Sequence, residues 1–345
     1  MKTAVVILNW NGRHLLESFL PALIRFTHGK ARLIVADNAS SDDSLNWLRN
    51  THPEIDIITN HVNEGFAKGY NTVLKNVSEE YLLLLNSDVE VTENWLAPLE
   101  TWLNSHPETA VCQPKILWHK NRQQFEYAGA AGGYIDHLGY PFCRGRIFGH
   151  LENDHGQYNN PVPVFWASGA CMMIRNKVFR EAGGFDASFF AHMEEIDICW
   201  RIRNMGYEIM CIPDSEVFHV GGATLPKNNP GKTLLNFRNN LSMLYKHLPP
   251  NKVFTVILLR LFLDGAAGIK FMLEGHGSDC IAVVKAHFQF YLRLLNGTIK
   301  RNLSEPKKLH PTIYRRNIAW QHYVLGKKEF SELNFHPEKA LKSKV

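Results

Sequence analysis

The sequence predicts an α/β protein with a Rossmann-like mixed, mostly parallel sheet flanked by helices and with a C-terminal helical extension. Two observations predict this fold class. Apolar runs of strand length alternate with amphipathic segments over about the first hundred residues, as in consecutive βα units. From about Thr233 the pattern changes to three long segments of helical character.

The composition is that of a globular protein. The chain has 345 residues, of which 45% are hydrophobic and 21% are charged, and its net charge is +5. Because this charge is modest, we expect no nucleic-acid partner. The six cysteines form no CxxC pair, so we expect reduced, mostly buried thiols in a cytosolic protein. We expect neither a signal peptide nor a membrane span, because no apolar stretch reaches roughly 18 residues.

Four strands are predicted in the first half of the chain, with helices between them. The strands are expected at residues 3–8, 32–36, 55–59 and 82–91. Leucines spaced three and four residues apart predict a helix after the first strand. Ser41 or Asp42 can cap a second helix at residues 44–49. A third helix is expected to begin in the two-glycine loop at residues 63–71.

The fourth strand carries a candidate metal ligand. It joins four leucines to a polar tip that ends in Asp88. A strand of this kind is buried on both faces and delivers its last carboxylate to the carboxyl edge of the sheet, where ligands bind. A carboxylate fixed there suits a divalent cation that also holds phosphate oxygens. The alternative is that Asp88 caps the helix near Trp95.

Polar residues at the other strand ends form a candidate nucleotide site. Asp37, at the end of the second strand, is placed to hydrogen-bond a base or a ribose. The loop at residues 63–71 opens a helix, so its backbone N–H groups suit phosphate. Its spacing is not that of a dinucleotide fingerprint, and an ordinary tight turn is the alternative.

The second half begins with a less regular region. Residues 112–165 contain scattered glycines and aromatic residues, and we expect an irregular, mobile insertion near the site. Further strands are expected at residues 171–174, 207–212 and 214–220, and a short helix at 176–182.

Three acidic residues open a predicted helix in this half. Glu194 and Glu195 lie in its first turn, where the helix dipole favours ionised carboxylates. An ionised carboxylate beside a sugar site can act as a general base, and simple charge complementation of the dipole is the alternative. Asp197 is expected to pair with Arg201 one turn later. His219 lies on a glycine-flanked turn, which leaves its ring free to reach a metal.

Three further helices are expected at residues 234–248, 253–274 and 282–296. Basic residues flank them at Lys300, Arg301, Lys307, Lys308, Arg315 and Arg316. Apolar, aromatic faces with basic flanks suit a helix on an anionic membrane surface. A helical subdomain packed on the sheet, or an interface of a homo-oligomer, is the alternative.

The chain contains six motifs in this order: VVILNWNG, VADNASSDDS, NEGFAKGYN, LLLLNSDVEV, the segment from Trp166 to Tyr207, and VFHVGG. Their order over about residues 3–245 resembles family 2 glycosyltransferases of the GT-A fold, above all the bacterial rhamnosyltransferase-like members. The resemblance implies an inverting transferase that uses a nucleotide-diphosphate sugar, either dTDP-rhamnose or a UDP-sugar. The acceptor would be a saccharide or lipid-linked hydroxyl in cell-surface polysaccharide synthesis.

The resemblance also implies roles for residues within the motifs. Nucleotide contacts are implied for Asn9, Asn11, Asp37, Asn63, Gly65, Lys68, Asn71 and Asn86. Acceptor or sugar contacts are implied for Trp166, Ser168 and Gly169. Asp88 and His219 would hold Mg²⁺ or Mn²⁺, with Asn86 in the place of the first acid of the family's DxD-type motif. Glu195 stands where the family has its catalytic Asp, which leaves the choice between Glu194 and Glu195 open.

Two alternatives to this function remain. A nucleotidyltransferase acting on sugar phosphates shares the nucleotide-binding half, and a non-catalytic scaffold would bind the nucleotide sugar without turnover. We expect residues 1–230 to form the nucleotide-sugar-binding and catalytic domain, and residues 231–345 to form a helical region that contacts membrane or protein. The expected location is the cytoplasm, at the inner face of the membrane if these helices contact lipid.

Overall fold

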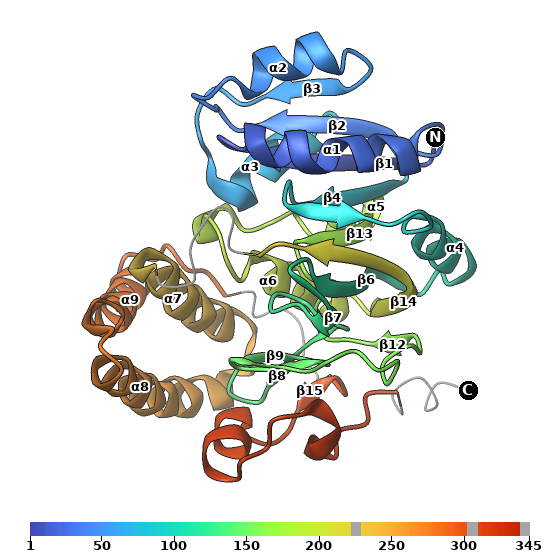
Figure 1. Cartoon of the computed structure of the whole chain (residues 1–345). Coiled ribbons are helices and arrows are strands. Elements are labelled where there is room, and N and C mark those ends of the chain that lie inside the picture. Colours follow the sequence, from blue (N-terminus) through green and yellow to red (C-terminus); the bar gives the residue numbers. More distant parts are fainter. Residues whose placement is uncertain (222–228, 302–309, 339–345) are drawn as a thin grey trace.

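The computed structural model describes residues 1–221, 229–301 and 310–338 (Figure 1). Its first half alternates strands and helices as predicted: β1 (Thr3–Asn9), α1 (Arg13–Thr27), β2 (Arg32–Asp37), α2 (Ser44–Thr51), β3 (Asp56–Thr59), α3 (Gly65–Leu74) and β4 (Tyr81–Leu85). These four strands are parallel and lie in the order β3-β2-β1-β4. The chain therefore reverses its direction of growth between β1 and β4, which is where open α/β sheets bind ligands.

The next part of the chain extends the same sheet beyond β4. It contains β5 (Val89–Val91), α4 (Ala97–Ser105), β6 (Thr109–Trp118), β7 (Asn121–Phe125), β12 (Val162–Pro163), β13 (Cys171–Arg175), α5 (Asn176–Glu181), the 3₁₀ turn η1 (Ala187–Phe189), α6 (Glu194–Asn204) and β14 (Glu208–His219). The order continues β4-β13-β6-β14-β12, while β5 pairs with β14 and β7 pairs with β6. β13 is antiparallel to β4, so the sheet of the described residues is mixed, as predicted.

Alternation along the strands builds a core on each face of this sheet. Val5 and Ile7 of β1 pack with α1 and α4 on one face. Ala4 and Val6 of β1 pack with α3 on the other. Because successive strand residues point to opposite faces, a run of apolar residues such as β4 is buried on both sides. All six cysteines belong to the described residues and are free, and five are buried, as expected.

The structure corrects the expectation of an irregular insertion at residues 112–165. β6 lies inside the main sheet, and a second sheet is formed by β8 (Gly133–Asp136), β9 (Pro141–Cys143), β10 (Arg146–Ile147), β11 (His150–Leu151) and β15 (Ile313–Tyr314). The prediction failed because β6 contains Gln113 and Lys115, two polar residues that are nevertheless buried. The strands of the second sheet are also too short to show a clear period of two.

The C-terminal helices are α7 (Pro230–His247), α8 (Pro250–Leu273) and α9 (Gly277–Leu295), which lie together beside the sheets (Figure 1). They begin three to five residues earlier than expected. α7 and α8 have a proline at the N-terminal position that favours helix initiation. A buried cluster holds α8: Asp264 accepts hydrogen bonds from Arg260 at 2.9 Å and from His287 at 3.0 Å. The boundary near residue 230 stays a prediction, since β15 returns to pair with β8.

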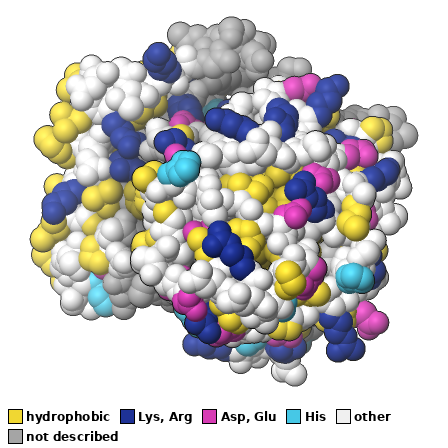
Figure 2. All heavy atoms as spheres, turned by 90° about the horizontal axis from the view of Figure 1, so that it is seen from above, with side chains coloured by type: hydrophobic (Ala, Val, Ile, Leu, Met, Phe, Trp, Pro, Cys, Tyr) yellow, Lys and Arg dark blue, Asp and Glu magenta, His cyan; other side chains and the backbone are white. Residues whose placement is uncertain are grey.

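No helix among the described residues has the length and apolar character needed to cross a bilayer. The outward surface of α8 and α9 is nevertheless apolar. Figure 2, in which these helices lie on the left as in Figure 1, shows hydrophobic side chains along that edge with lysine and arginine among them. Of the predicted basic flanks, Lys307 and Lys308 lie outside the described residues.

Candidate active site

Asp88 and His219 meet at the carboxyl edge of the main sheet. β5 pairs with β14 in a register that sets Val89 opposite His219, and the N–H of Val220 donates to the carbonyl of Asp88 at 3.1 Å. Two residues 131 positions apart are thereby adjacent, with Asp88 Oδ1 at 3.1 Å from His219 Nε2. Both side chains are buried. The structure thus brings together the two predicted metal ligands.

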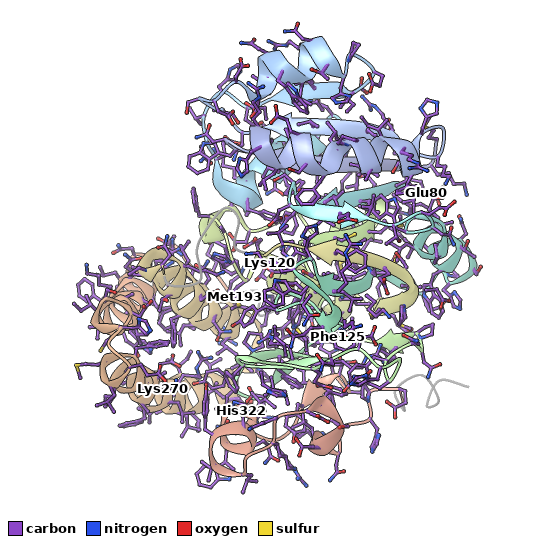
Figure 3. The ribbon with its side chains drawn as sticks, in the orientation of Figure 1. Glu80, Lys120, Phe125, Met193, Lys270 and His322 are labelled. Carbon is purple, nitrogen blue, oxygen red and sulfur yellow. The ribbon has the colours of Figure 1, made fainter. Side chains whose placement is uncertain are left out.

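Glu126 joins this pair, although no motif or spacing in the sequence predicted it. Glu126 directly follows β7, whose last residue, Phe125, is labelled in Figure 3. Its Oε2 lies 3.3 Å from His219 Nδ1, but the two atoms do not have the geometry of a hydrogen bond. Burial would lower the pKa of His219, but the charges of Glu126 and Asp88 outweigh it and raise that pKa to about 10. A positive charge between two buried carboxylates is therefore favoured at neutral pH.

The chemistry of this cluster fits a divalent cation. Asp88 Oδ1 would be one ligand of such a cation, and His219 Nε2 would be another once the cation has displaced its proton. Glu126 on the second ring nitrogen would complete a carboxylate–histidine–metal arrangement. Within the described residues, no group of three or more His, Cys, Asp and Glu side chains is arranged to hold a metal ion. One or two protein ligands suffice, however, when substrate phosphates complete the coordination. The residues present fit a cation shared with a diphosphate.

Replacing Glu126 by Gln is expected to weaken Mn²⁺ binding by about 10- to 100-fold, because the histidine would lose the carboxylate that orients its ring. The measurement is the free Mn²⁺ concentration, followed by electron paramagnetic resonance during titration with a nucleoside diphosphate present. Unchanged Mn²⁺ affinity in a variant that melts at the wild-type temperature without metal would show that Glu126 does not support a metal ligand.

The predicted nucleotide residues Asn9, Asn11 and Asp37 lie together at the ends of β1 and β2. Asn9 is opposite Asp37 in the strand register, and its Nδ2 donates to Asp37 Oδ1 at 3.2 Å. The backbone N–H of Ser40 donates to Asp37 Oδ2 at 2.9 Å, and that of Ser41 donates to Asn11 Oδ1 at 2.7 Å. These bonds join the two strand ends into one edge, and the nucleotide roles of the residues remain predictions.

The loop before α3 holds a second group of predicted nucleotide residues. Asn63 Oδ1 accepts from the N–H of Gly65 at 2.9 Å, which shapes the turn into the helix. Lys68 pairs with Glu64 one turn earlier at 2.8 Å. The N–H of Asn86 donates to the carbonyl of Ala170, in the turn before β13, at 3.0 Å. The loop is thus held by local bonds, and the polar tip after β4 is held by a bond to a distant turn.

Asn71 and the predicted acceptor residues contact mainly protein. The side chain of Asn71 bonds to both the N–H and the carbonyl of Phe185, at 2.9 and 2.7 Å. The indole of Trp166 donates to the carbonyl of Tyr134 in β8 at 2.9 Å. The hydroxyl of Ser168 donates to the carbonyl of Ala128. Both side chains are buried, whereas Gly169 is half-buried. Their proposed contacts with sugar or acceptor stay predictions.

Glu194 and Glu195 begin α6, as expected, directly after Met193, which Figure 3 labels between α7 and the strands of the sheet. Each glutamate has one buried oxygen, Oε2, with no hydrogen-bond partner among the described residues. Burial raises the pKa of Glu195 to about 7. Burial, and then the charge of Glu195, raise the pKa of Glu194 well above its ordinary range. Burial thus corrects the expectation that the helix dipole keeps both ionised.

Asp197 has the structural role expected for it, with more partners than expected. It accepts from Arg201 at 2.9 Å, and also from Lys246 at 2.9 Å and His247 at 2.8 Å on α7. Despite its burial, these partners hold the pKa of Asp197 well below its usual range. The helix that carries Glu194 and Glu195 is therefore anchored to α7 from its own buried side.

The chain is similar to two characterised transferases. It is 28% identical over 213 residues to the low-salt glycan biosynthesis hexosyltransferase Agl10 of Haloferax volcanii, which covers 60% of this chain and 63% of that protein. It is 24% identical over 225 residues to the N-acetylglucosaminyl-diphospho-decaprenol L-rhamnosyltransferase of Mycobacterium tuberculosis, over 60% of this chain and 72% of that protein. The match to Agl10 thus spans less than two thirds of its length.

The fold is similar to that of a solved glycosyltransferase. The mannosyltransferase PcManGT from Pyrobaculum calidifontis, in complex with GDP-Man and Mn²⁺, matches with a TM-score of 0.52 and 14% identity, over 84% of this chain and 87% of that one. The profile of Glycosyl transferase family 2 matches residues 4–183, more than half of the 345 residues. This chain belongs to glycosyl transferase family 2 and has the GT-A fold.

Proposed function

We propose that this protein is a metal-dependent, inverting glycosyltransferase of cell-surface polysaccharide synthesis. Its donor would be dTDP-rhamnose or a UDP-sugar, and its acceptor a hydroxyl of a saccharide or lipid-linked saccharide. The observation that carries the proposal is the buried pair of Asp88 and His219 at the carboxyl edge of the sheet, in a chain of this family. A rhamnose donor and a lipid-linked acceptor are supported by the similarity to the N-acetylglucosaminyl-diphospho-decaprenol L-rhamnosyltransferase.

In the proposed reaction the acceptor oxygen bonds to the anomeric carbon of the donor sugar, and the bond from that carbon to the phosphate oxygen breaks. Glu195 takes the proton of the acceptor hydroxyl, a transfer that typically supplies about 10² to 10⁴ in rate. A divalent cation held by Asp88 and His219 would neutralise charge on the departing nucleoside diphosphate. Burial and then the charge of Glu195 raise the pKa of Glu194 well above its ordinary range, which disfavours a second negative charge beside the base.

A product assay tests this function against its two alternatives. The protein is incubated with UDP-, dTDP- and GDP-sugars and Mn²⁺, with and without a lipid-diphosphate saccharide as acceptor. A glycosyltransferase releases a nucleoside diphosphate in step with glycosylated acceptor. Release of pyrophosphate from a nucleoside triphosphate and a sugar phosphate would instead identify a nucleotidyltransferase. Nucleotide binding without any product would favour the scaffold.

The lipid-linked acceptor is supported by the surface of the C-terminal helices. Of 23 large hydrophobic side chains exposed in the described residues, 17 lie between Phe254 and Leu325. Eight are on α8, five are on α9 and four are at residues 320–325. Tyr323 continues the patch from α8, since the Lys270 ammonium lies 5.8 Å from its ring centre, and Figure 3 shows Lys270 near this segment. Soluble proteins seldom leave so many apolar side chains together in water.

The charges around this surface favour an anionic bilayer as its partner. Between residues 250 and 301, all described, the exposed Lys, Arg, Asp and Glu side chains are Lys252, Lys270, Glu274, Lys285 and Lys300. Glu274 is paired with Lys270 at 2.5 Å, so the surface is net positive. A two-fold interface with a second copy would bring like charges together, whereas anionic headgroups would neutralise them.

Replacing Phe262 by Glu is expected to lower vesicle binding by about 10-fold or more, because burial of a phenylalanine side chain contributes roughly 1.5 to 3 kcal/mol. Phe262 is 69% exposed on α8, and Val62, 60% exposed in the loop between β3 and α3, provides the control variant Val62→Glu. Co-sedimentation with phosphatidylcholine vesicles, with and without phosphatidylglycerol, measures the binding. Failure of the wild type to bind either kind of vesicle, or a stable dimer in solution, would contradict a membrane surface.

A further inference from the structure

The loop that leads into the candidate base has a strained backbone. In the described part of the chain, eight non-glycine residues have positive φ, and three of them are Phe190 (66°), His192 (69°) and Met193 (74°). Side chains disfavour this left-handed region, so surrounding contacts must hold such a conformation in place. We call residues 189–193 the entry loop. Glu194 and Glu195 follow it directly, so its path determines where their carboxylates lie.

One side chain of α7 binds most of the entry loop. Asn239 Nδ2 lies within donor distance of three loop carbonyls, those of Phe189 at 3.0 Å, Ala191 at 2.9 Å and His192 at 2.9 Å. Asn239 is fully buried. Its Oδ1 accepts from Nε of Arg238 at 3.0 Å, which orients the amide with its nitrogen toward the loop. A single amide group therefore satisfies carbonyls that the strained path turns toward α7.

The opposite side of the entry loop contacts α3, the helix that follows the loop of predicted nucleotide residues. The carbonyl of Phe190 accepts from the N–H groups of Phe66 at 2.8 Å and Ala67 at 3.2 Å, in the first turn of α3. A Cβ on Gly65 would lie 2.6 Å from the ring of Phe190 and 2.7 Å from its carbonyl oxygen, so the approach requires glycine. The entry loop is thus held between α3 and α7.

We propose that Asn239 is a positioning residue for the transfer reaction: it holds the entry loop in the strained path that places the Glu195 carboxylate for proton transfer. This inference rests on the proposed function, in which Glu195 is the base. It also assigns a catalytic purpose to α7, a C-terminal helix that lies outside residues 4–183, the part matched by the family profile. The side-chain amide of Asn239 bonds to backbone carbonyls of the entry loop, and Asn239 takes no part in the chemistry.

The test compares two neighbouring isosteric changes on α7. Asn239→Asp keeps the shape of the side chain but turns a carboxylate oxygen toward three carbonyl oxygens. We expect kcat to fall by about 100-fold, the cost of a misplacement of about 1 Å, while KM for the donor changes little. Asn240→Asp is the control, because the Asn240 amide donates to the carbonyl of Gly139 at 2.8 Å and its Oδ1 accepts from Arg260. Its contact with the entry loop is a weak one, from the amide nitrogen to Met193 Sδ at 3.8 Å, and involves no loop carbonyl. We expect the control to keep a kcat within about two-fold of wild type.

Three readouts separate positioning from loss of folding. The melting temperature reports the folded fraction, the thermal shift with nucleoside diphosphate and Mn²⁺ reports donor binding, and the pH profile of kcat reports the base. Positioning predicts that donor binding is kept and that the pH profile of Asn239→Asp is displaced from that of wild type. If Asn239→Asp does not fold, Asn239→Ala is tested in the same way, because it removes the amide N–H groups without adding a repulsive oxygen.

The outcomes also separate this inference from the proposed function. An Asn239→Asp variant with wild-type kcat, or a folded Asn239→Asp or Asn239→Ala variant that loses kcat and donor binding together, would overturn the positioning role. A wild-type protein without transfer activity, or a fully active Glu195→Gln variant, would instead overturn the assigned reaction or its base. Loss of kcat in Asn239→Asp with donor binding kept, in a protein that Glu195→Gln inactivates, supports both.

Discussion

Replacing Glu195 by Gln is expected to lower kcat by at least about 10²- to 10⁴-fold, while the donor still binds nearly as in wild type. Glutamine has the shape of glutamate but cannot accept the proton of the acceptor hydroxyl. Because Glu195 Oε2 is buried with no hydrogen-bond partner among the described residues, the change at that oxygen leaves no donor unpaired. Steady-state kinetics with donor and acceptor measure kcat, and a thermal shift with nucleoside diphosphate and Mn²⁺ measures donor binding.

Glu194→Gln is the matched control for this experiment. Burial and then the charge of Glu195 raise the pKa of Glu194 well above its ordinary range, which favours the neutral carboxyl, and an amide is a neutral group of the same shape. We therefore expect Glu194→Gln to keep most of the activity. Loss of activity in Glu194→Gln together with full activity in Glu195→Gln would move the base to Glu194.

The pH dependence of wild-type kcat gives a second check on the same base. The pKa of Glu195 is raised by burial to about 7, and only the ionised form accepts a proton. The reaction rate should therefore rise as the pH increases through about 7 and should level off above it. A rate that is constant from pH 5 to pH 9 would contradict a base with this pKa.

Replacing Asp88 by Asn is expected to abolish transfer and to remove the metal-dependent part of nucleotide binding. In the wild type, a nucleoside diphosphate at 100 times its dissociation constant should add about 2.7 kcal/mol of stability. The measurement is a thermal-shift panel of UDP, TDP and GDP, each with and without Mn²⁺ or Mg²⁺. A shift that needs metal in the wild type and is absent in Asp88→Asn would identify the base of the donor and support Asp88 as a metal ligand.

Glu90→Gln is the control for Asp88→Asn. Glu90 is two residues further along the chain, and its carboxylate pairs with Arg122 at 2.7 Å rather than with His219. We expect this variant to retain the metal-dependent shift. An Asp88→Asn protein that binds nucleotide and metal as the wild type does would contradict the metal site. It would also remove the main support for the proposed function, which is the pairing of Asp88 with His219.

Local sequence patterns were sufficient for most of the fold. The four parallel strands and their helices follow from apolar runs and helix-period leucines, which depend on residues a few positions apart. The same holds for the placement of Asp37 and Asp88 near one sheet edge, because the carboxyl ends of parallel strands meet there. The helix that begins at Glu194 was likewise predictable from its acids and their spacing.

Contacts between distant parts of the chain determined the rest. Glu126 reaches His219 through a hairpin that has no periodic signal, and the raised pKa of Glu194 comes mainly from its burial in the packed structure. The hold of Asn239 on the entry loop joins residues about fifty positions apart. Strand pairing, burial and amide–carbonyl contacts of this kind depend on three-dimensional proximity, and no pattern along the chain encodes them. Periodicity therefore located the elements and their polar ends, whereas tertiary packing set the charge and the orientation of the groups proposed to react.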